Sequence, residues 1–479
     1  MSSARRPRAW RQWRAARNAA AVASVRRTEL PGFQSGAPPE PEPSSWRPRW
    51  LNRNLVCLFA GRALRSASQA YLVIVVPLYL AALGYDAVHI GVMFTIVAVA
   101  SAAMAAFTGI MSDRFGRKAL LIVISLMTAA GGAVFACSSS FVVLTVAAAV
   151  GTIGRGGGAG SAGAFGPYYP AEQPLIAEQA SDLDRTTVFG ALSFVAVLGG
   201  AAGSLLAWAP RLMRQSFGLP ILEGYRALFV LTAAIGLAMA AVVMPVREHH
   251  GGAAHPPGGR GAAPARPPGA PRTSGLVLGL SRASWRLVAR FMVTAATNGL
   301  AIGMLGPLLV YWFYRRYGVD AAEIGKLYFV LNLVAAMPYL LAGRMATRFG
   351  SVKAVVVCRG IASILLWVMV IMPSFWLAGL LYGARMIFNT LSIPVRQSFL
   401  MGVIPPAERS SAAGMASFPA QAGSAITPYV AGYLMQQVAL ALPLELAALL
   451  QALNAALYYF FFRAVRPPEE ISADTGERL

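Results

Sequence analysis

Residues 109–118 read Gly-Ile-Met-Ser-Asp-Arg-Phe-Gly-Arg-Lys, a short charged segment that joins two long apolar runs. The first run covers residues 88–111 and the second covers residues 119–138. A helix that crosses the roughly 30 Å hydrocarbon core of a membrane needs about 20 apolar residues, and each run supplies them. The segment is therefore predicted to be a tight, charged turn between two membrane-spanning helices.

Similar apolar runs occupy most of the chain. Of the 479 residues, 57% are hydrophobic and only 13% are charged, whereas an average soluble domain carries roughly 25% charged residues. Lipid must therefore be the solvent for much of the surface. We predict an all-α integral membrane protein with twelve transmembrane helices, placed near residues 54–82, 88–111, 119–138, 141–166, 187–209, 225–246, 287–314, 324–346, 352–373, 376–401, 411–436 and 443–463.

The basic residues alternate with these spans along the chain. The formal net charge is +22, and such a charge is typical either of nucleic-acid binding or of basic loops retained in the cytoplasm. Arginines crowd the first 50 residues, the turn after residue 111, the segment 247–290 and the end of the chain, while most opposite connections carry none. Both termini are therefore predicted to be cytoplasmic in a multi-pass protein of the inner (plasma) membrane, with no nucleic acid as partner. The exceptions on the opposite side are Arg211, Arg214, Arg315 and Arg316.

The two parts of the chain are related by an internal repeat. One constant shift along the chain aligns Ile90-Gly91 with Ile324-Gly325, and Arg114-Phe115-Gly116 with Arg348-Phe349-Gly350. Matches that keep their order indicate a duplication of six helices, which predicts a binding cavity between the halves. The expected divisions are a basic tail (1–50), an N-terminal six-helix half (51–246), a Pro/Gly/Arg-rich cytoplasmic linker (247–286), a C-terminal six-helix half (287–465) and a cytoplasmic tail (466–479).

Residues 109–118 also resemble the G-x-x-x-D-R-x-G-R-[RK] signature of the major facilitator superfamily at every specified position. A partial copy lies at residues 343–350, where Thr347 replaces the aspartate. The resemblance extends over residues 51–465 and implies two pseudo-symmetric six-helix bundles that rock between inward-open and outward-open states. Asp113 can accept hydrogen bonds from a helix N-terminus of the other half in the outward-open state. The predicted conformational switch loop consists of Gly109, Asp113, Arg114, Gly116, Arg117 and Lys118.

Charged and amide side chains inside the spans are the candidate site residues, because charges are costly in the membrane. The alternative is that the arginines reach the cytoplasmic surface or bind backbone carbonyls. No acidic residue is expected near the middle of a span, so Asp113 and Glu172 at the membrane edge are the candidates for proton coupling. The predicted cavity, substrate or coupling residues are Arg62, Arg65, Gln69, Arg155, Asn298, Asn332, Arg385 and Asn389.

A further charged motif follows the fourth predicted span. Glu178 and Arg185 have the spacing E-x6-R, which resembles a cytoplasmic charge pair of sugar-transporting members of the family. The second half has Gly402 where the glutamate would be repeated, so only part of the pattern is present.

Together these features predict a transporter that moves a small molecule by alternating access, with efflux of an amphipathic or drug-like compound as the main hypothesis. Import of an anionic or polar metabolite stays open, as does a membrane sensor that has lost transport. The expected partners are the small-molecule substrate, the lipid bilayer and, if transport is coupled, protons. We expect a monomer with no cofactor and no metal site. No enzymatic activity is expected, because no nucleophile–base pair or metal-ligand motif is present.

Overall fold

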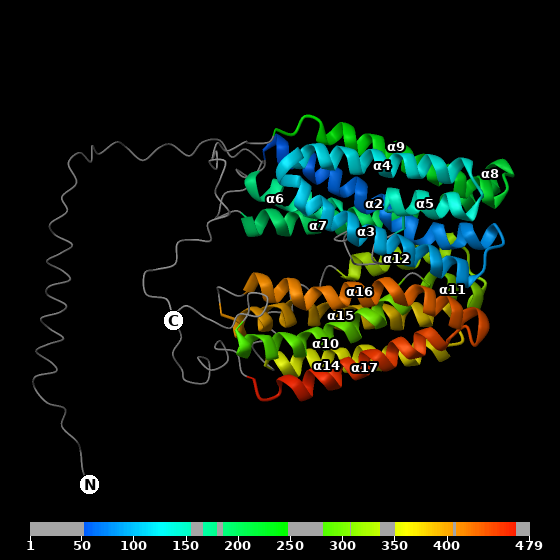
Figure 1. Ribbon diagram of the computed structural model, residues 1–479. Coiled ribbons are helices and arrows are strands. Elements are labelled where there is room, and N and C mark those ends of the chain that lie inside the picture. The colour runs from blue at the N-terminus through cyan, green and yellow to red at the C-terminus, as the bar shows by residue number, and fades with distance from the viewer. Residues whose placement is uncertain are drawn as a thin grey trace, which may run out of the picture. The chain divides into compact units, whose positions relative to one another are not determined.

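The computed structural model (Figure 1) describes the membrane part of the chain. The chain divides into two compact units, Met1–Arg49 and Trp50–Leu479, and every described residue belongs to the second. Both predicted tails and most of the predicted central linker lie outside the described residues, so the predicted divisions of the chain stay predictions. The described residues are 52–154, 166–179, 185–247, 281–306, 308–335, 350–405 and 409–465.

All regular structure in these residues is helical, as expected where backbone groups have no water to bind. Polar side chains just before the helices satisfy free amide groups at several starts. The Asn52 side chain, for example, accepts a 2.7 Å hydrogen bond from the Leu55 amide. The helices before residue 247 are α2 (Arg53–Ala82), α3 (Ala87–Phe115), α4 (Arg117–Cys137), α5 (Phe141–Gly151), α6 (Tyr168–Gln179), α7 (Arg185–Leu206), α8 (Ala209–Phe217) and α9 (Ile221–Val243).

The second group of helices follows residue 280 and lies beside the first in Figure 1. Its first helix is capped by Ser281, whose hydroxyl accepts a hydrogen bond from the Ser284 amide at 3.3 Å. The helices of this half are α10 (Arg282–Leu305), α11 (Leu309–Tyr317), α12 (Ala321–Ala335), α14 (Ser351–Ile371), α15 (Phe375–Val403), α16 (Arg409–Gln437) and α17 (Leu442–Phe462).

Eight helical stretches in the described residues are long and apolar enough to cross a membrane. Each coincides with one of the expected spans. The other four expected spans contain α5, α12, α15 and α16, of which α5 is an apolar helix of 11 residues and α12 has 15. The all-helical membrane fold predicted from the sequence is therefore confirmed, while the count of twelve crossings stays a prediction.

The distribution of side chains is that of a protein solvated by lipid. Large apolar side chains such as Ile364 and Leu380 are 64% and 67% exposed. In contrast, the charged side chains Arg62, Glu172 and Arg359 are at most 4% exposed. A soluble protein hides its apolar side chains and keeps charges in water, so this arrangement requires a hydrocarbon environment around the helices.

The predicted duplication is visible in the packing of the two halves. In the first half α2 packs against α7 and α9, and α4 packs against α9; in the second, α10 packs against α16 and α17, and α14 packs against α17. Local geometry repeats at the offset that aligns the two sequences. Asp86 and Asp320 each accept a hydrogen bond from the amide three residues later. Gly116 and Gly350 have nearly equal positive φ angles of 85° and 79°, which glycine adopts without a steric penalty.

The contacts between the halves concentrate at one end of the helices. We call this the far end; it contains the α2–α3 turn, the first turns of α3 and α12, and α8 and α11, and Figure 1 draws it at the right. Here α3 packs against α16, and α12 packs against α7. A Cβ atom added at Gly91 would lie 2.4 Å from the Pro428 carbonyl oxygen, and one at Gly325 would lie 2.6 Å from that of Ser204. The opposite end, with the α3–α4 turn, is called the near end.

Glycines also bring helices of the same half into backbone contact. A Cβ atom at Gly203 of α7 would lie 2.2 Å from the Ala67 carbonyl oxygen of α2, and one at Gly299 of α10 would lie 2.2 Å from the Ala420 carbonyl oxygen of α16. Small residues at helix interfaces are the usual means of close packing in lipid. The two halves are therefore each held together by contacts that tolerate no added atom.

A substitution at this contact tests the packing. We expect Gly203→Ala to lower the free energy of unfolding by about 1–3 kcal/mol, because the methyl group forces α2 and α7 apart. Gly360→Ala on α14 is the matched control, since a Cβ atom there meets nothing within 4 Å and alanine favours the helix. Thermal unfolding of the purified proteins in detergent measures both, and equal melting temperatures for the two variants would contradict the proposed contact.

Candidate functional site

A buried ion pair joins α2 to α6 inside the N-terminal half. Arg62 Nη1 lies 2.6 Å from Glu172 Oε2, and the two side chains are 4% and 1% exposed. Charges removed from water are costly unless they are paired, so each of these side chains fixes the position of the other. Among the acidic side chains that the structure describes, Glu172 is the one that is buried. The others are at least partly exposed.

Arg65 lies one turn further along α2 and stacks on an aromatic ring. Its guanidinium carbon is 4.6 Å from the ring centroid of Tyr168, the first residue of α6. Gly166 has a φ of +96°, and a Cβ atom there would lie 3.2 Å from an Arg65 nitrogen. A glycine before α6 thus gives Arg65 room beside the ion pair.

The fourth predicted span is interrupted rather than continuous. Helix α5 ends at Gly151. The next residue, Thr152, has a left-handed φ of 52°, and Gly154 has a φ of 80°. The Thr152 carbonyl, freed from the helix, accepts a hydrogen bond from Gln69 Nε2 at 3.3 Å. Helix α6 begins at Tyr168, so Glu172 lies within a helix of the bundle and is buried rather than exposed at the membrane edge, where the sequence placed it.

The C-terminal half contains a different arrangement of buried polar groups. Arg359 of α14 donates from Nη1 to Asn298 Oδ1 of α10 at 2.8 Å and also to Asn454 Oδ1 of α17. Asn454 in turn donates to the Thr294 carbonyl. This arginine is therefore held by amides of two neighbouring helices and has a structural role.

Arg385 of α15 is 4% exposed and lies over the ring of Tyr382, one turn earlier, at 5.5 Å from its centroid. Asn389, one turn later on the same helix, is half-buried, and its carbonyl accepts a hydrogen bond from Ser392. The predicted cavity residues thus form separate groups: Arg62, Arg65 and Gln69 in one half, and Asn298, Arg385 and Asn389 in the other.

Asn332 lies at the boundary between the halves. Its Nδ2 donates to Ser204 Oγ of α7 at 3.1 Å and to the Tyr328 carbonyl at 2.9 Å. It therefore contributes to the contact between α12 and α7. Arg155, predicted as a cavity residue, lies outside the described residues.

The predicted switch loop is described only in part. Gly109 lies in α3, Asp113 and Arg114 lie in its last turn, and Gly116 is the link between α3 and α4, but the side chains of Asp113 and Arg114 lie outside the described residues. Arg117 forms an ion pair with Glu178. The loop is thereby connected to α6, the helix that carries Glu172. Lys118 is partly exposed, and the Arg185 side chain, the predicted partner of Glu178, also lies outside the described residues.

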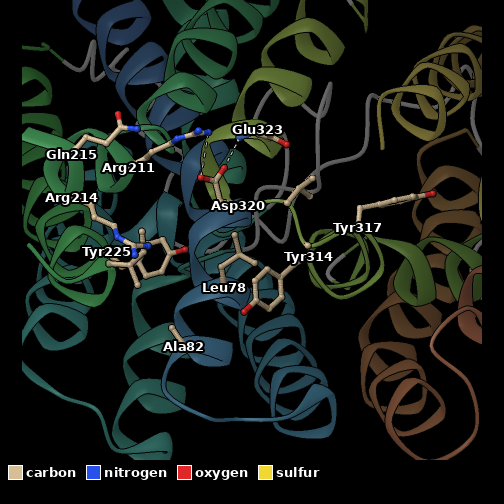
Figure 2. Close-up of a pocket in the computed structure, with 13 residues that line it drawn as sticks. Leu78, Ala82, Arg211, Arg214, Gln215, Tyr225, Tyr314, Tyr317, Asp320 and Glu323 are labelled. Carbon is tan, nitrogen blue, oxygen red and sulfur yellow. Dashed lines mark hydrogen bonds and ion pairs between the residues drawn. The ribbon is translucent and has the colours of Figure 1, made fainter. Parts of the chain in front are cut away.

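A pocket of about 700 Å³ lies at the far end, between α2, α8 and α9 of one half and α11 and α12 of the other. Figure 2 shows Arg211 pointing toward Asp320 across the boundary between the halves, with 3.6 Å between Nη1 and Oδ2. In the sequence, Arg211 is only an exception to the charge rule, and no spacing along the chain indicates its contact with Asp320. The other lining residues include Arg214, Tyr225, Tyr314, Tyr317 and Glu323.

Among the described residues, no group of three His, Cys, Asp or Glu side chains is placed to hold a metal ion. The buried chemistry of the two halves consists of arginines with a carboxylate, amides and tyrosines. Such groups can bind an anion, exchange a proton or hold helices together, according to the partner that each finds.

Comparison with known proteins agrees with this architecture. A model of the Major Facilitator Superfamily matches residues 58–390 and 291–478. The chain is 25% identical over 386 residues to multidrug resistance protein MdtG of Proteus mirabilis. The aligned part covers 77% of this chain and 84% of that protein. A bacterial homolog of the human lysosomal transporter Spinster has a similar structure, with a TM-score of 0.64, 15% identity and coverage of 87% of this chain and 98% of that one.

A D-xylose–proton symporter is also similar in structure, with a TM-score of 0.63, 14% identity and coverage of 85% of this chain and 97% of that one. At these identities the structural matches show the fold alone. The family model, however, matches most of the chain, including both halves and the signature loop. This multi-pass membrane protein therefore belongs to the major facilitator superfamily.

Proposed function

We propose that this transporter exports an amphipathic, drug-like compound across the inner membrane in exchange for protons, and that Glu172 carries the proton. The observation that carries the proposal is the buried Arg62–Glu172 pair. Similarity to a protein named for multidrug resistance supports export. Import of an anionic metabolite is the alternative, and the direction of substrate movement in vesicles distinguishes the two.

The charge distribution supports an orientation. Arg117 and Lys118 follow the α3–α4 turn at the near end, and Lys353 lies in the first turn of α14 in the second half. By the positive-inside rule the near end is cytoplasmic, and so are both termini. The far end, where the halves are in contact, then faces the outside, and the state described is closed toward that side.

The Arg62–Glu172 pair suggests how a proton could drive the exchange. With Glu172 ionised, the two charges neutralise one another within the low dielectric of the bundle. Protonation of Glu172 leaves Arg62 without its counter-charge. The free energy of packing α2 against α6 therefore depends on whether Glu172 is protonated. Because the Arg117–Glu178 pair links the same helix to the switch loop, a shift of α6 is transmitted to the near-end turn.

The proton carrier is tested by Glu172→Gln, which keeps the size of the side chain and removes its charge. We expect a pH gradient to drive no uphill export by this variant in proteoliposomes, while exchange of substrate for substrate continues. The double variant Arg62→Gln/Glu172→Gln, which leaves no unpaired charge in the bundle, should fold well and show the same uncoupling.

Glu445→Gln serves as the control, since Glu445 lies in the first turn of α17, outside both the ion pair and the switch loop. It should transport like the unmodified protein. Full export driven by the pH gradient in the Glu172 variant would refute the assignment, and absence of any transport by the unmodified protein would refute the function.

The Arg211–Asp320 pair is expected to stabilise closure of the far end. Arg211→Glu and Asp320→Arg each place like charges across the boundary, whereas the double exchange restores opposite charges. Exposed ion pairs contribute about 0.2–1 kcal/mol, so we expect each single variant to raise labelling of the far end by a few-fold and the double variant to return it to the original rate.

The measurement uses Ser204→Cys, since Ser204 is fully buried between the halves. The native Cys57, Cys137 and Cys358 are replaced by serine, and the rate of reaction with a membrane-impermeant maleimide is followed in whole vesicles. Equal labelling rates in all four charge combinations would show that this pair has no part in closing the far end.

A further inference from the structure

Arg385 is a buried cation with few polar partners among the described residues. Its side chain is 4% exposed, its Nε has no hydrogen-bond partner, and its described partner is Tyr382, which shares a side-chain hydrogen bond with it and whose ring centroid lies 5.5 Å away. The Nε atoms of Arg62 and Arg359 also have no partner, and Arg65 also stacks on a tyrosine ring, but Arg65 lies beside Glu172 and the other two arginines have polar side-chain partners. Arg62 is paired with Glu172, and Arg359 is held by two asparagine side chains.

An arginine in this position requires an explanation. Its guanidinium stays charged under all physiological conditions and presents five N–H donors in a plane. Within a membrane protein such a charge is costly unless it has an anionic or strongly polar partner, and residues of this kind mark pathways for substrates and ions. The contact with Tyr382 offsets only part of this cost.

The C-terminal half provides no internal counter-charge near Arg385 among its described residues. The described acidic residues of this half are Asp320, Glu323 and Glu445. Asp320 and Glu323 lie at the start of α12, and Glu445 lies in the first turn of α17, all at the far end. Arg359 and Arg396 are near enough to act on one another electrostatically, and Arg385 also acts on Arg359. Together these arginines give the region a positive potential that no described carboxylate of the C-terminal half neutralises.

Three side chains of different chemistry lie in succession along α15 around Arg385. Tyr382, Arg385 and Asn389 follow one another at spacings of three and four residues, which places them on one face of the helix. They offer an aromatic ring, a planar cation and an amide in succession. A carboxylate, sulfonate or phosphate group fits the guanidinium in a two-pronged geometry, while an adjoining apolar body can pack on the tyrosine.

We propose that Arg385, with Tyr382 and Asn389 beside it, binds the negatively charged group of the transported compound, so that the cargo is an amphipathic anion. This inference rests on the proposed transport function. In the N-terminal half a carboxylate, Glu172, lies beside both Arg62 and Arg65, whereas the C-terminal half carries a cation that no described carboxylate neutralises. The proton and the anion therefore bind in different halves, and the rocking of one half against the other couples them.

The test uses the purified full-length protein in non-ionic detergent and three matched aromatic probes: naphthalene sulfonate, naphthalene sulfonamide and naphthyl trimethylammonium. Thermal stabilisation gives the affinity of each probe. We expect the sulfonate to bind most tightly to the unmodified protein. Arg385→Gln should weaken it by about 10- to 100-fold, as for loss of a hydrogen-bonded charge pair, and leave the sulfonamide nearly unchanged. Arg385→Lys keeps the positive charge but not the planar, two-pronged guanidinium. Its affinity for the sulfonate should therefore lie between those of the unmodified protein and Arg385→Gln.

Arg463→Gln is the matched control. Arg463 also lies over a tyrosine ring, at 5.9 Å from Tyr459, but it is exposed. It should not change the affinity for any probe. If Arg385→Gln does not fold, the order of the three probes on the unmodified protein decides, because a preference for the sulfonamide or the ammonium overturns the proposal.

The two proposals fail in different ways. If the ammonium probe is bound and exported while Arg385→Gln has no effect on binding, the export function stands and the anion site is wrong. If none of the three probes is bound or transported, the proposed function and the anion site both fall. An equal affinity of the unmodified protein and Arg385→Gln for the sulfonate also refutes the anion site.

Discussion

A guanidinium group in the hydrocarbon core of a membrane has no water to solvate it, so each buried arginine must find its partner inside the protein or in a bound ligand. This constraint determines much of the interior. Arg62 reaches Glu172 from a helix that lies 110 residues away in the chain, and Arg359 joins α10, α14 and α17 through two asparagines. The backbone obeys the same constraint, since the break after α5 is tolerated where Gln69 binds the freed Thr152 carbonyl.

The duplicated halves share their geometry but not their chemistry. The pairs α2–α7 and α10–α16 correspond in packing, and Gly116 and Gly350 correspond in conformation. The buried charges do not correspond: the N-terminal half contains a carboxylate that neutralises one arginine, and the described C-terminal half contains none in its interior. Two halves of the same fold with different buried charges can each bind a different ligand. Both ligands can then act on the same rocking motion of the halves.

The local features of this fold could be read from the sequence, and the long-range ones could not. Apolar runs of sufficient length predicted the helices, and the constant offset between matching segments predicted the duplication, because both depend on spacing along the chain. Glu172 was assigned to the membrane edge because the fourth predicted span, 141–166, ended before it. That it lies inside the bundle depends on packing against α2. The Arg211–Asp320 contact likewise joins residues of different halves, for which spacing gives no signal.

Glycines such as Gly91 and Gly325 bring backbones of the two halves together, but the described polar contacts between the halves are few, and this favours rigid-body motion. Within each half, glycines such as Gly203 and Gly299 bring backbones together along the length of the helices, and separating them would leave voids that lipid cannot fill well. Between the halves, the described polar contacts are an amide–hydroxyl hydrogen bond from Asn332, the Thr95–Tyr429 hydrogen bond, a partly exposed ion pair and the ammonium of Lys326 over the ring of Trp208. Such contacts are individually weak. The halves can therefore separate at the far end without loss of their own cores, and occupation of a charged site in either half is enough to shift that balance.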